Sequence, residues 1–205
     1  MINGADHSVV LFSIGHSNQS IEAFLELLRQ HELQVLIDVR SSPYSKYVPH
    51  FNSAFLISAL RQAGIKYVFM GNELGGRPNG DEFYDADNYV LYDRMASAPF
   101  FLKGLKRIQK IGNFYRSAIL CSEENPAICH RHLLIGRVLS QQGCELLHIR
   151  GDGHLQTEKE LTSREEMPSY GQSLWGEPLV QRGENIWKSI RPVLRKKQQP
   201  SSSEL

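Results

Sequence analysis

The chain has 205 residues, of which 41% are hydrophobic and 22% are charged, as in an ordinary globular protein with one sizeable domain. Its formal net charge of +1 excludes the strongly basic composition of many nucleic-acid-binding proteins, so nucleic acid stays open as a partner without being indicated. No apolar run approaches the ~20 residues of a membrane span. We therefore expect no membrane partner, and the composition leaves the oligomeric state open.

Residues 1–12 lack the charged start and apolar core of a signal peptide. We therefore predict a cytoplasmic protein, in which a reducing environment keeps Cys121, Cys129 and Cys144 as free thiols or metal ligands and not as structural disulfides. Cys144 opens a predicted strand and is expected in the core.

Short apolar runs alternate with amphipathic segments along most of the chain. The apolar runs predict strands over residues 9–15, 34–40, 65–70, 116–122 and 144–150. The amphipathic segments predict helices over residues 20–31, 52–64, 88–98, 99–111 and 127–142. This alternation predicts an α/β fold, with a mainly parallel sheet of about five strands and helices on both of its faces.

The alternating pattern fades near residue 166. We expect a single α/β domain over residues 1–165, followed by an extension over residues 166–205. The end of that extension, "RKKQQPSSSEL", predicts a frayed, disordered tail.

Polar residues follow each predicted strand, and ligands of open α/β sheets bind outside the carboxyl ends of the strands. We therefore expect these residues to converge at one edge of the sheet as a composite pocket. In chain order they are His16, Ser17, Asn18, Asp38, Arg40, Ser41, Ser42, Pro43, Asn72, Glu73, Gly75, Gly76, Arg77, Cys121, Ser122, Glu123, Cys129, His130, Arg131, Arg150, Gly151, Asp152 and His154.

Asp38 lies in the otherwise apolar stretch "VLIDVR", where a buried carboxylate must be paired or hydrogen-bonded. Arg40 lies on the same face of the strand by alternation. The pair is either an internal brace or a carboxylate that orients a catalytic or binding group.

The stretch "NELGGRPNG" contains a glycine pair, Gly75 and Gly76, which permits close backbone approach. Glu73 and Arg77 on either side would contact a ligand or each other. The tyrosines that follow would stack on a base as a lid or pack in the core: Tyr84, Tyr89 and Tyr92.

The stretch "LCSEENPAICHRHLL" carries two thiols, an imidazole and a guanidinium within a dozen residues. An Asn-Pro pair at 125–126 is a good helix start, with Asn as the cap and Pro at the first helical position. Cys129 then falls in or just after the first turn. There the positive end of the helix, His130 and Arg131 would lower the pKa of its thiol.

Two interpretations of this stretch involve an anion. A cysteine thiolate could act as nucleophile, with His130 as the base or Arg131 as the anion clamp. The ten residues from Cys121 to Arg131 fit neither a tyrosine-phosphatase loop nor a rhodanese loop. Alternatively, helix amides could bind an anion without covalent chemistry, together with Arg131, Arg40 and Arg77.

Two further interpretations need no anion. Cys121, Cys129 and His130, with His16 or His132, could supply zinc ligands, although no CxxC or HxxxH spacing is present. The thiols could equally be small buried residues, with the His-Arg pair bracing the turn to a carboxylate.

Five motifs occur in order along the chain: "SIGHSN", "IDVRSSPYSKYVPHFN", "YVFMGNELGGRP", "LCSEENPAICHRHLL" and "LLHIRGDGHL". By these motifs the chain resembles, over about residues 9–160, the bacterial and archaeal "domain of unknown function" family numbered four-eight-eight. The resemblance implies the fold and the site but no reaction. The family's motif residues fall on His16, Ser17, Asp38, Arg40, Pro43, Ser45, Glu73, Gly75, Gly76, Cys121, Glu123, Cys129, His130 and Arg131.

We predict an enzyme that acts on a small anionic or nucleotide-like substrate at a Cys/His/Arg pocket on the carboxyl edge of the sheet. The alternatives are a non-catalytic module that binds a nucleotide or nucleic acid, and a Cys/His metal site. The cofactor stays open, and no residue is assigned as a metal ligand. Catalysis is assigned to Cys121, Cys129, His130, His16, Asp38 and Glu123. Substrate binding is assigned to Ser17, Arg40, Ser45, Glu73, Gly75, Gly76, Arg77 and Arg131.

Overall fold

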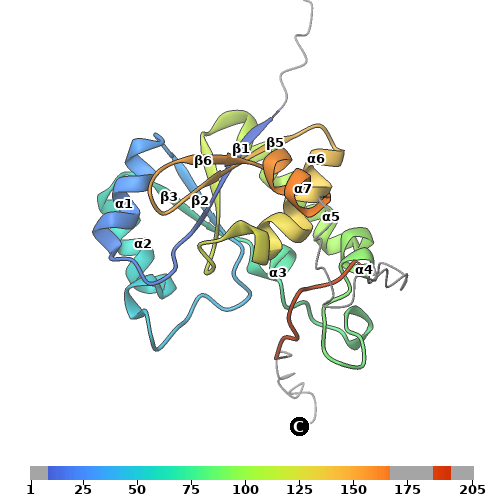
Figure 1. The fold of residues 1–205 in the computed structure, drawn as a ribbon. Coiled ribbons are helices and arrows are strands. Elements are labelled where there is room, and N and C mark those ends of the chain that lie inside the picture. Colours follow the sequence, from blue (N-terminus) through green and yellow to red (C-terminus); the bar gives the residue numbers. More distant parts are fainter. Residues whose placement is uncertain (1–8, 167–186, 195–205) are drawn as a thin grey trace, which may run out of the picture.

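The computed structural model describes residues 9–166 and 187–194, in which a central sheet is flanked by helices (Figure 1). The sheet has the strand order β3-β2-β4-β1-β5-β6. Its strands are β1 Val10–Gly15, β2 Val35–Asp38, β3 Lys66–Phe69, β4 Ser117–Cys121, β5 Glu145–Ile149 and β6 Leu155–Thr157. The first five run parallel and β6 runs antiparallel to β5, which confirms the predicted fold class and adds one strand.

Helices cover both faces of the sheet. On one face lie α1 Ile21–Gln30, η1 Pro49–Phe51 and α2 Ser53–Gln62. On the other lie α3 Gly71–Leu74, α4 Tyr92–Ser97, α5 Pro99–Phe114, η4 Arg131–Gly136, α6 Arg137–Gln141 and α7 Glu158–Glu166. The remaining short turns are η2 Asp81–Phe83 and η3 Pro126–Ile128. No helix in these described parts of the chain is long and apolar enough to cross a membrane.

Alternation along the strands decides which face each side chain occupies. On β1, Phe12 and Ile14 pack against α1 and α2, and Leu11 packs on the opposite face. Ser13 shares the face of Leu11, where it is fully buried. A buried hydroxyl needs a hydrogen-bond partner, so this position marks the start of a polar network within the core.

The helix predicted over residues 127–142 is confirmed over residues 131–141 but starts later than predicted, because the separate turn η3 precedes it. Asn125 does cap a helical start, since its side chain accepts a hydrogen bond from the backbone of Ala127 at 3.1 Å. The turn ends at Ile128, however, and Cys129 is extended, with φ −119° and ψ 145°. The chain then continues as the π-helical η4 and the α-helical α6. The thiol of Cys129 therefore lies at a break between helices.

The predicted helix over residues 88–98 starts only at Tyr92. Asn88 has a left-handed backbone with φ 64°, and Val90 pairs with the described C-terminal segment instead of joining a helix. In that pairing, the backbone of Ser189 donates to the Val90 carbonyl at 2.8 Å. Residues 187–194 of the predicted extension thus pack on the domain, whereas the predicted tail lies outside the described residues.

Candidate functional site

A cavity of about 530 Å³ opens at the carboxyl edge of the sheet. The strand ends meet there because β1, β2 and β4 run parallel in close register, with Gly15 beside Cys121 and Asp38 beside Leu120. Five chain segments supply its walls. The lining residues are Arg40, Ser41, Ser42, Tyr44, Ser45, Gly76, Arg77, Tyr92, Cys121, Ser122, Glu123, Ile128, Cys129, His130, Ser189, Ile190, Arg191, Pro192 and Val193.

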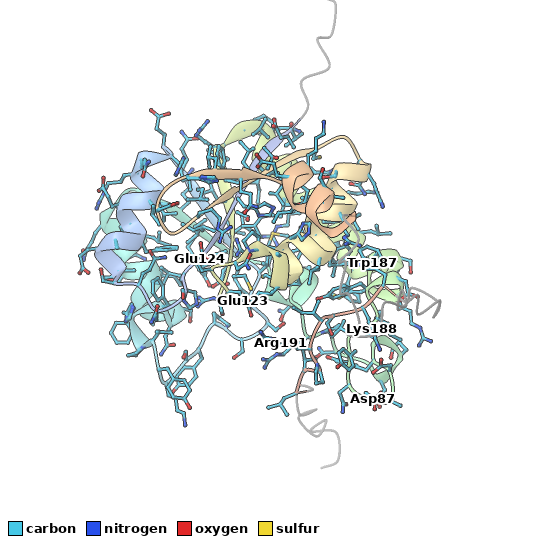
Figure 2. The ribbon with its side chains drawn as sticks, viewed as in Figure 1. Asp87, Glu123, Glu124, Trp187, Lys188 and Arg191 are labelled. Atoms are coloured by element: carbon cyan, nitrogen blue, oxygen red, sulfur yellow. The ribbon has the colours of Figure 1, made fainter. Side chains whose placement is uncertain are left out.

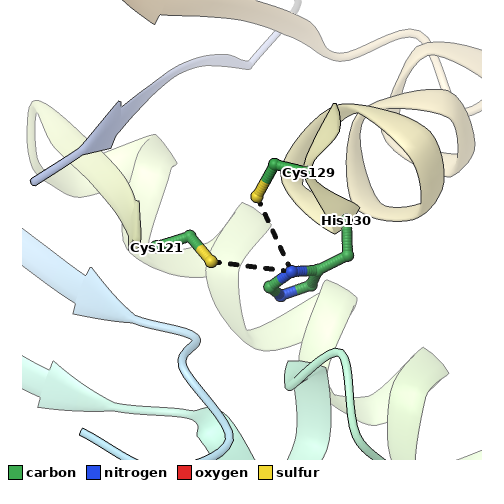
Figure 3. Close-up of side chains that lie close together, drawn as sticks. All are labelled: Cys121, Cys129 and His130. Carbon is green, nitrogen blue, oxygen red and sulfur yellow. Dashed lines mark hydrogen bonds between the residues drawn. The ribbon is translucent and has the colours of Figure 1, made fainter. Parts of the chain in front are cut away.

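Two thiols, a carboxylate and an imidazole gather in this cavity. The sulfur atoms of Cys121 and Cys129 lie 3.6 Å and 3.7 Å from Nδ1 of His130, and both point toward that ring (Figure 3). When protonated, each thiol can also donate to Oε2 of Glu123, which lies 3.0 Å from the sulfur of Cys121 and 3.3 Å from that of Cys129. We call these four residues the open cluster, because all of them line the cavity.

The pKa values of the two thiols shift in opposite directions. The hydrogen bond to Cys129 and burial raise the pKa of Cys121. Burial opposes charge on Cys129 as well, but the hydrogen bond from Cys121 and the positive charges of Arg131 and His130 lower its pKa overall. Burial would lower the pKa of His130, but its contact with Cys129 raises it. In the metal-free state this arrangement favours a thiolate at Cys129 beside an imidazolium at His130.

Close packing on Gly15 and hydrogen bonds from Arg131 and Arg150 fix the loop that carries Glu123 and Glu124. A side chain at Gly15 would place its Cβ 1.7 Å from the Glu123 carbonyl oxygen, so only glycine lets the loop cross the end of β1. The fully buried Arg131 donates from Nη2 to the carbonyls of Glu123 and Glu124, at 2.6 Å and 3.0 Å. Arg150 grips the Glu124 carboxylate through two bonds of 2.9 Å.

The glycine pair brings a second loop against the open cluster. A Cβ at Gly76 would lie 3.1 Å from the ring of His130, and a Cβ at Gly75 would lie 2.4 Å from Oγ of Ser41. Ser41 in turn accepts a hydrogen bond from the backbone of Arg77 at 2.9 Å. The pair therefore permits the close contact that fixes one side of the imidazole.

Two arginines stand at the mouth of the cavity with free guanidinium groups. Arg77 and Arg191 are both exposed, and neither guanidinium has a hydrogen-bond or ion-pair partner among residues 9–166 and 187–194. Figure 2 shows Arg191 in the same region of the molecule as Glu123. Tyr92 lies buried in the wall, where burial and the nearby thiols and Glu123 raise the pKa of its phenol, so the hydroxyl stays protonated.

Asp38, Arg40 and His16 form a separate group on the face of the sheet covered by α1 and α2. Arg40 donates to Asp38 through Nε and through Nη2, the latter at 2.6 Å, and through Nη1 to the Phe51 carbonyl at 2.9 Å. Tyr67 completes the group by donating to Asp38 at 2.8 Å. The arrangement has the form of the internal brace.

His16 faces the brace and not the thiols. Its Nδ1 donates to the Ser17 carbonyl at 2.8 Å, and its Nε2 accepts from Nη1 of Arg40 at 3.1 Å. Burial and the charge of Arg40 outweigh the hydrogen bond and lower the pKa of His16 to about 4. The imidazole is therefore neutral near pH 7.

The predicted site residues divide by position. Those that line the cavity are Arg40, Ser45, Gly76, Arg77, Cys121, Glu123, Cys129 and His130. Those that lie beside or beneath it are His16, Ser17, Asp38, Glu73, Gly75 and Arg131, with Glu73 paired to Arg107 at 3.3 Å. Of the other lining residues, Ser41, Ser42 and Ser122 belong to the polar residues that were expected at this edge, whereas Tyr44 was not predicted. Residues 189–193 carry no local signal for a site.

A second group of polar side chains is buried deeper in the same layer. The sequence analysis missed it as a group and named only His132, as a possible zinc ligand beside the thiols. The Glu158 carboxylate lies between two imidazoles, 2.6 Å from Nδ1 of His132 and 2.7 Å from Nε2 of His148. Nδ1 of His148 lies 2.6 Å from Oγ of Ser13, which also accepts from Nη1 of Arg131 at 2.9 Å. We call Ser13, His132, His148 and Glu158 the closed cluster, because none of them lines the cavity.

Comparison with known protein families identifies a matching family. The model of the family described as "Domain of unknown function DUF488" matches residues 20–138, a stretch that contains β2, β3, β4 and the open cluster. The predicted resemblance reached further at both ends, to about residues 9 and 160. No curated protein and no solved structure matches the chain. Since the family model covers more than half of the residues, the chain belongs to the DUF488 family.

Proposed function

We propose that this protein is an enzyme that acts on a small anionic substrate bound in the cavity above the open cluster. The observation that carries the proposal is the pairing of two kinds of group in one space. The free guanidinium groups of Arg77 and Arg191 stand at the mouth, and Cys121, Cys129 and His130 stand inside. A cavity of about 530 Å³ is large enough for a nucleotide-sized molecule.

The two arginines supply the charge for binding an anion. A guanidinium presents a fork of donors that fits carboxylate and phosphate oxygens, and no described carboxylate occupies either fork. Arg40 also lines the cavity, but its guanidinium already donates hydrogen bonds to Asp38, His16 and Phe51. We therefore assign Arg40 a structural role in the cavity wall and not a role in anion binding.

The open cluster supplies groups able to accept and donate protons. Glu123 is exposed and lies within hydrogen-bond distance of both thiols, and His130 joins them from the other side. Tyr92 adds a protonated hydroxyl that could donate to a substrate oxygen. Such groups at the inner end of an anion-binding cavity support an enzyme over a simple binding module.

A ligand screen tests this function. The melting temperature is measured with inorganic phosphate, nucleotides and phosphorylated metabolites, because a ligand that binds only the folded state raises it. Hits are titrated by calorimetry and then incubated with the protein, with chromatography to detect conversion. Arg77→Gln and Arg191→Gln should each weaken binding at least about tenfold, the cost of a charge-assisted hydrogen bond.

Arg29→Gln is the matched control, because Arg29 pairs only with Glu26 on the exposed surface of α1. It should leave binding unchanged. Binding without conversion would leave a binding module and remove the enzyme. If no anion raises the melting temperature, or if the two pocket variants bind as tightly as the control, the proposed function fails.

A further inference from the structure

The open cluster has the composition and spacing of a metal centre. Cys121 ends β4, while Cys129 and His130 lie at the break between η3 and η4, so two segments of the chain meet around one point (Figure 3). One ligand-type atom from each residue lies within 4.8 Å of the other two. Two sulfurs and one imidazole nitrogen form a donor set that favours zinc over magnesium or calcium, which prefer oxygen.

The distances between these atoms fit one shared ion. With a zinc–sulfur bond of ~2.3 Å and a zinc–nitrogen bond of ~2.05 Å, a tetrahedral angle places sulfur and nitrogen about 3.6 Å apart. Nδ1 of His130 lies 3.6 Å from the sulfur of Cys121 and 3.7 Å from that of Cys129. Both separations are therefore close to those expected for ligands that share one tetrahedral zinc ion.

The surroundings of the thiols also suit a bound cation. The backbone N–H of Arg131 donates to the sulfur of Cys129 at 3.5 Å, a contact that stabilises a thiolate ligand. Within the described parts of the chain, Nε2 of His130 is buried and has no hydrogen-bond partner. With Nδ1 on the metal, that second nitrogen carries the ring proton.

We propose that Cys121, Cys129 and His130 bind one zinc ion whose fourth position opens into the cavity beside the Glu123 carboxylate. Three protein ligands and one open position are typical of catalytic zinc, whereas structural zinc has four protein ligands. In the metal-free state the exposed Glu123 carboxylate accepts hydrogen bonds from both thiols, at 3.0 Å and 3.3 Å. Zinc would displace both thiol protons and so release the carboxylate, which would then accept a proton from a water at the open position.

The metal inference deepens the proposed function and rests on it only for the role of the ion toward a substrate. Zinc lowers the pKa of a bound water to about 7 and polarises oxygen atoms of a bound molecule. An anion held by Arg77 and Arg191 would therefore meet the open position from the mouth of the same cavity.

Metal analysis decides the site. The protein and three cysteine variants are purified under reducing conditions without chelator, and zinc is measured by mass spectrometry. The protein should carry about one zinc per chain, and Cys121→Ser and Cys129→Ser should carry less than about a tenth. Cys144→Ser is the matched control, because Cys144 is equally buried but its sulfur contacts Gln109 and lies outside the cavity. It should keep its zinc.

A cobalt titration covers the case in which the serine variants fail to fold. Protein freed of metal by a chelator is titrated with Co²⁺, and a tetrahedral site with two thiolates gives intense visible bands and sulfur-to-cobalt charge transfer. Both signals should appear and then vanish when zinc is added. Absence of zinc from the protein together with absence of these bands overturns the proposal, as does full zinc in a folded Cys129→Ser variant.

The two proposals fail separately. Stoichiometric zinc in a protein that binds no anion would leave the metal site and remove the proposed substrate pocket. Anion binding that depends on Arg77 and Arg191 in a protein that takes up neither zinc nor cobalt would leave the pocket and remove the metal.

Discussion

His130 and His132 lie two residues apart at the start of η4, yet they belong to clusters of opposite character. His130 faces the cavity with two thiols, and its Nε2 has no partner in the described structure. His132 points into the core, where Glu158 lies 2.6 Å away. Both clusters bring metal-ligand side chains within 4.8 Å of one another, so composition alone does not separate them.

Hydrogen-bond saturation is what separates the two clusters. In the closed cluster, Ser13 accepts from Arg131 and donates to Nδ1 of His148, and Nε2 of His148 then donates to Glu158. Every contact is 2.6–2.9 Å long, the length of a hydrogen bond and shorter than the spacing of ligands around a zinc ion. A buried chain of this kind ties β1, β5, η4 and α7 together, whereas the open cluster leaves its atoms available to ligands.

Arg131 joins the two clusters. Its Nη1 donates to Ser13 of the closed cluster, and its Nη2 donates to the backbone that carries Glu123 of the open cluster. The guanidinium is fully buried and lies outside the cavity lining. We therefore expect a positioning role for Arg131 in place of the direct anion contact predicted from the sequence.

The largest effect should come from breaking the closed cluster. Glu158→Ala leaves two buried imidazoles without their shared acceptor, and we expect a loss of about 3–5 kcal/mol in the free energy of unfolding. Urea titration followed by circular dichroism measures it. The exposed neighbour Lys159→Ala should change the value by less than about 0.5 kcal/mol. A loss below about 1 kcal/mol would show that the cluster does not stabilise the fold.

A somewhat smaller effect is expected at the residue that joins the clusters. Arg131→Met fills similar space but leaves the Ser13 hydroxyl and two loop carbonyls without a donor, for a cost of about 2–3 kcal/mol. It should also weaken zinc and anion binding, because the loop of Glu123 loses its anchor. Arg150→Met removes the partly exposed pair with Glu124 and one hydrogen bond to Gln156, and should cost less. Equal losses in both variants would contradict the joining role.

The difference between the clusters also shows which features could be predicted from the sequence. Continuous apolar runs identified five strands, and the rule that ligands bind at the carboxyl ends of parallel strands placed Cys121, Glu123, Cys129 and His130 at one edge. The closed cluster has no such signal. His132, His148 and Glu158 come from three elements that meet only after the sheet order is set, and β6 is too short to show a pattern.

The composite pocket was predicted too broadly because strand order and facing were unknown. Asp38 shares its face with Leu36 toward α1 and α2, and Cys121 shares its face with Ile119 toward the other layer. Two residues at the same sheet edge can therefore lie in different groups. The helix break at Cys129 also lacked a signal, because the Asn-Pro start that is present locally predicts one continuous helix.

The third prediction concerns the pH dependence of stability through His148 of the closed cluster, for which we expect a moderate effect. Burial lowers the pKa of His148 below its ordinary value of about 6.5, although its bond to Glu158 opposes the shift. The unfolded chain therefore takes up the proton first. Stability falls as pH drops through about 6.5, by at most about 1.4 kcal/mol per pH unit for this one group.

Proton NMR tests the direction of this shift. The imidazole resonance of His148 is assigned by its absence in His148→Gln and then followed from pH 8 to pH 5. Its titration midpoint should lie below the ordinary value of about 6.5, because burial disfavours the charged ring more than the bond to Glu158 favours it. A titration midpoint at or above about 6.5 would mean that the closed cluster holds a charged imidazole.

The smallest change in stability is expected for a substitution at Gly76, the glycine that contacts His130. This substitution should disturb the open cluster and leave the closed cluster intact. In Gly76→Ala the new Cβ would lie 3.1 Å from Cγ and Nδ1 of the ring, so the imidazole must shift by a few tenths of an ångström. Stability should change by less than about 1 kcal/mol, since the backbone of Gly76 is not left-handed. Zinc affinity should fall about tenfold or more, because a coordinated ring tolerates little displacement. Gly151→Ala is the control, with its nearest atoms at 3.7 Å on the Glu124 side chain. If Gly76→Ala keeps full zinc affinity, the orientation of His130 does not set the metal site.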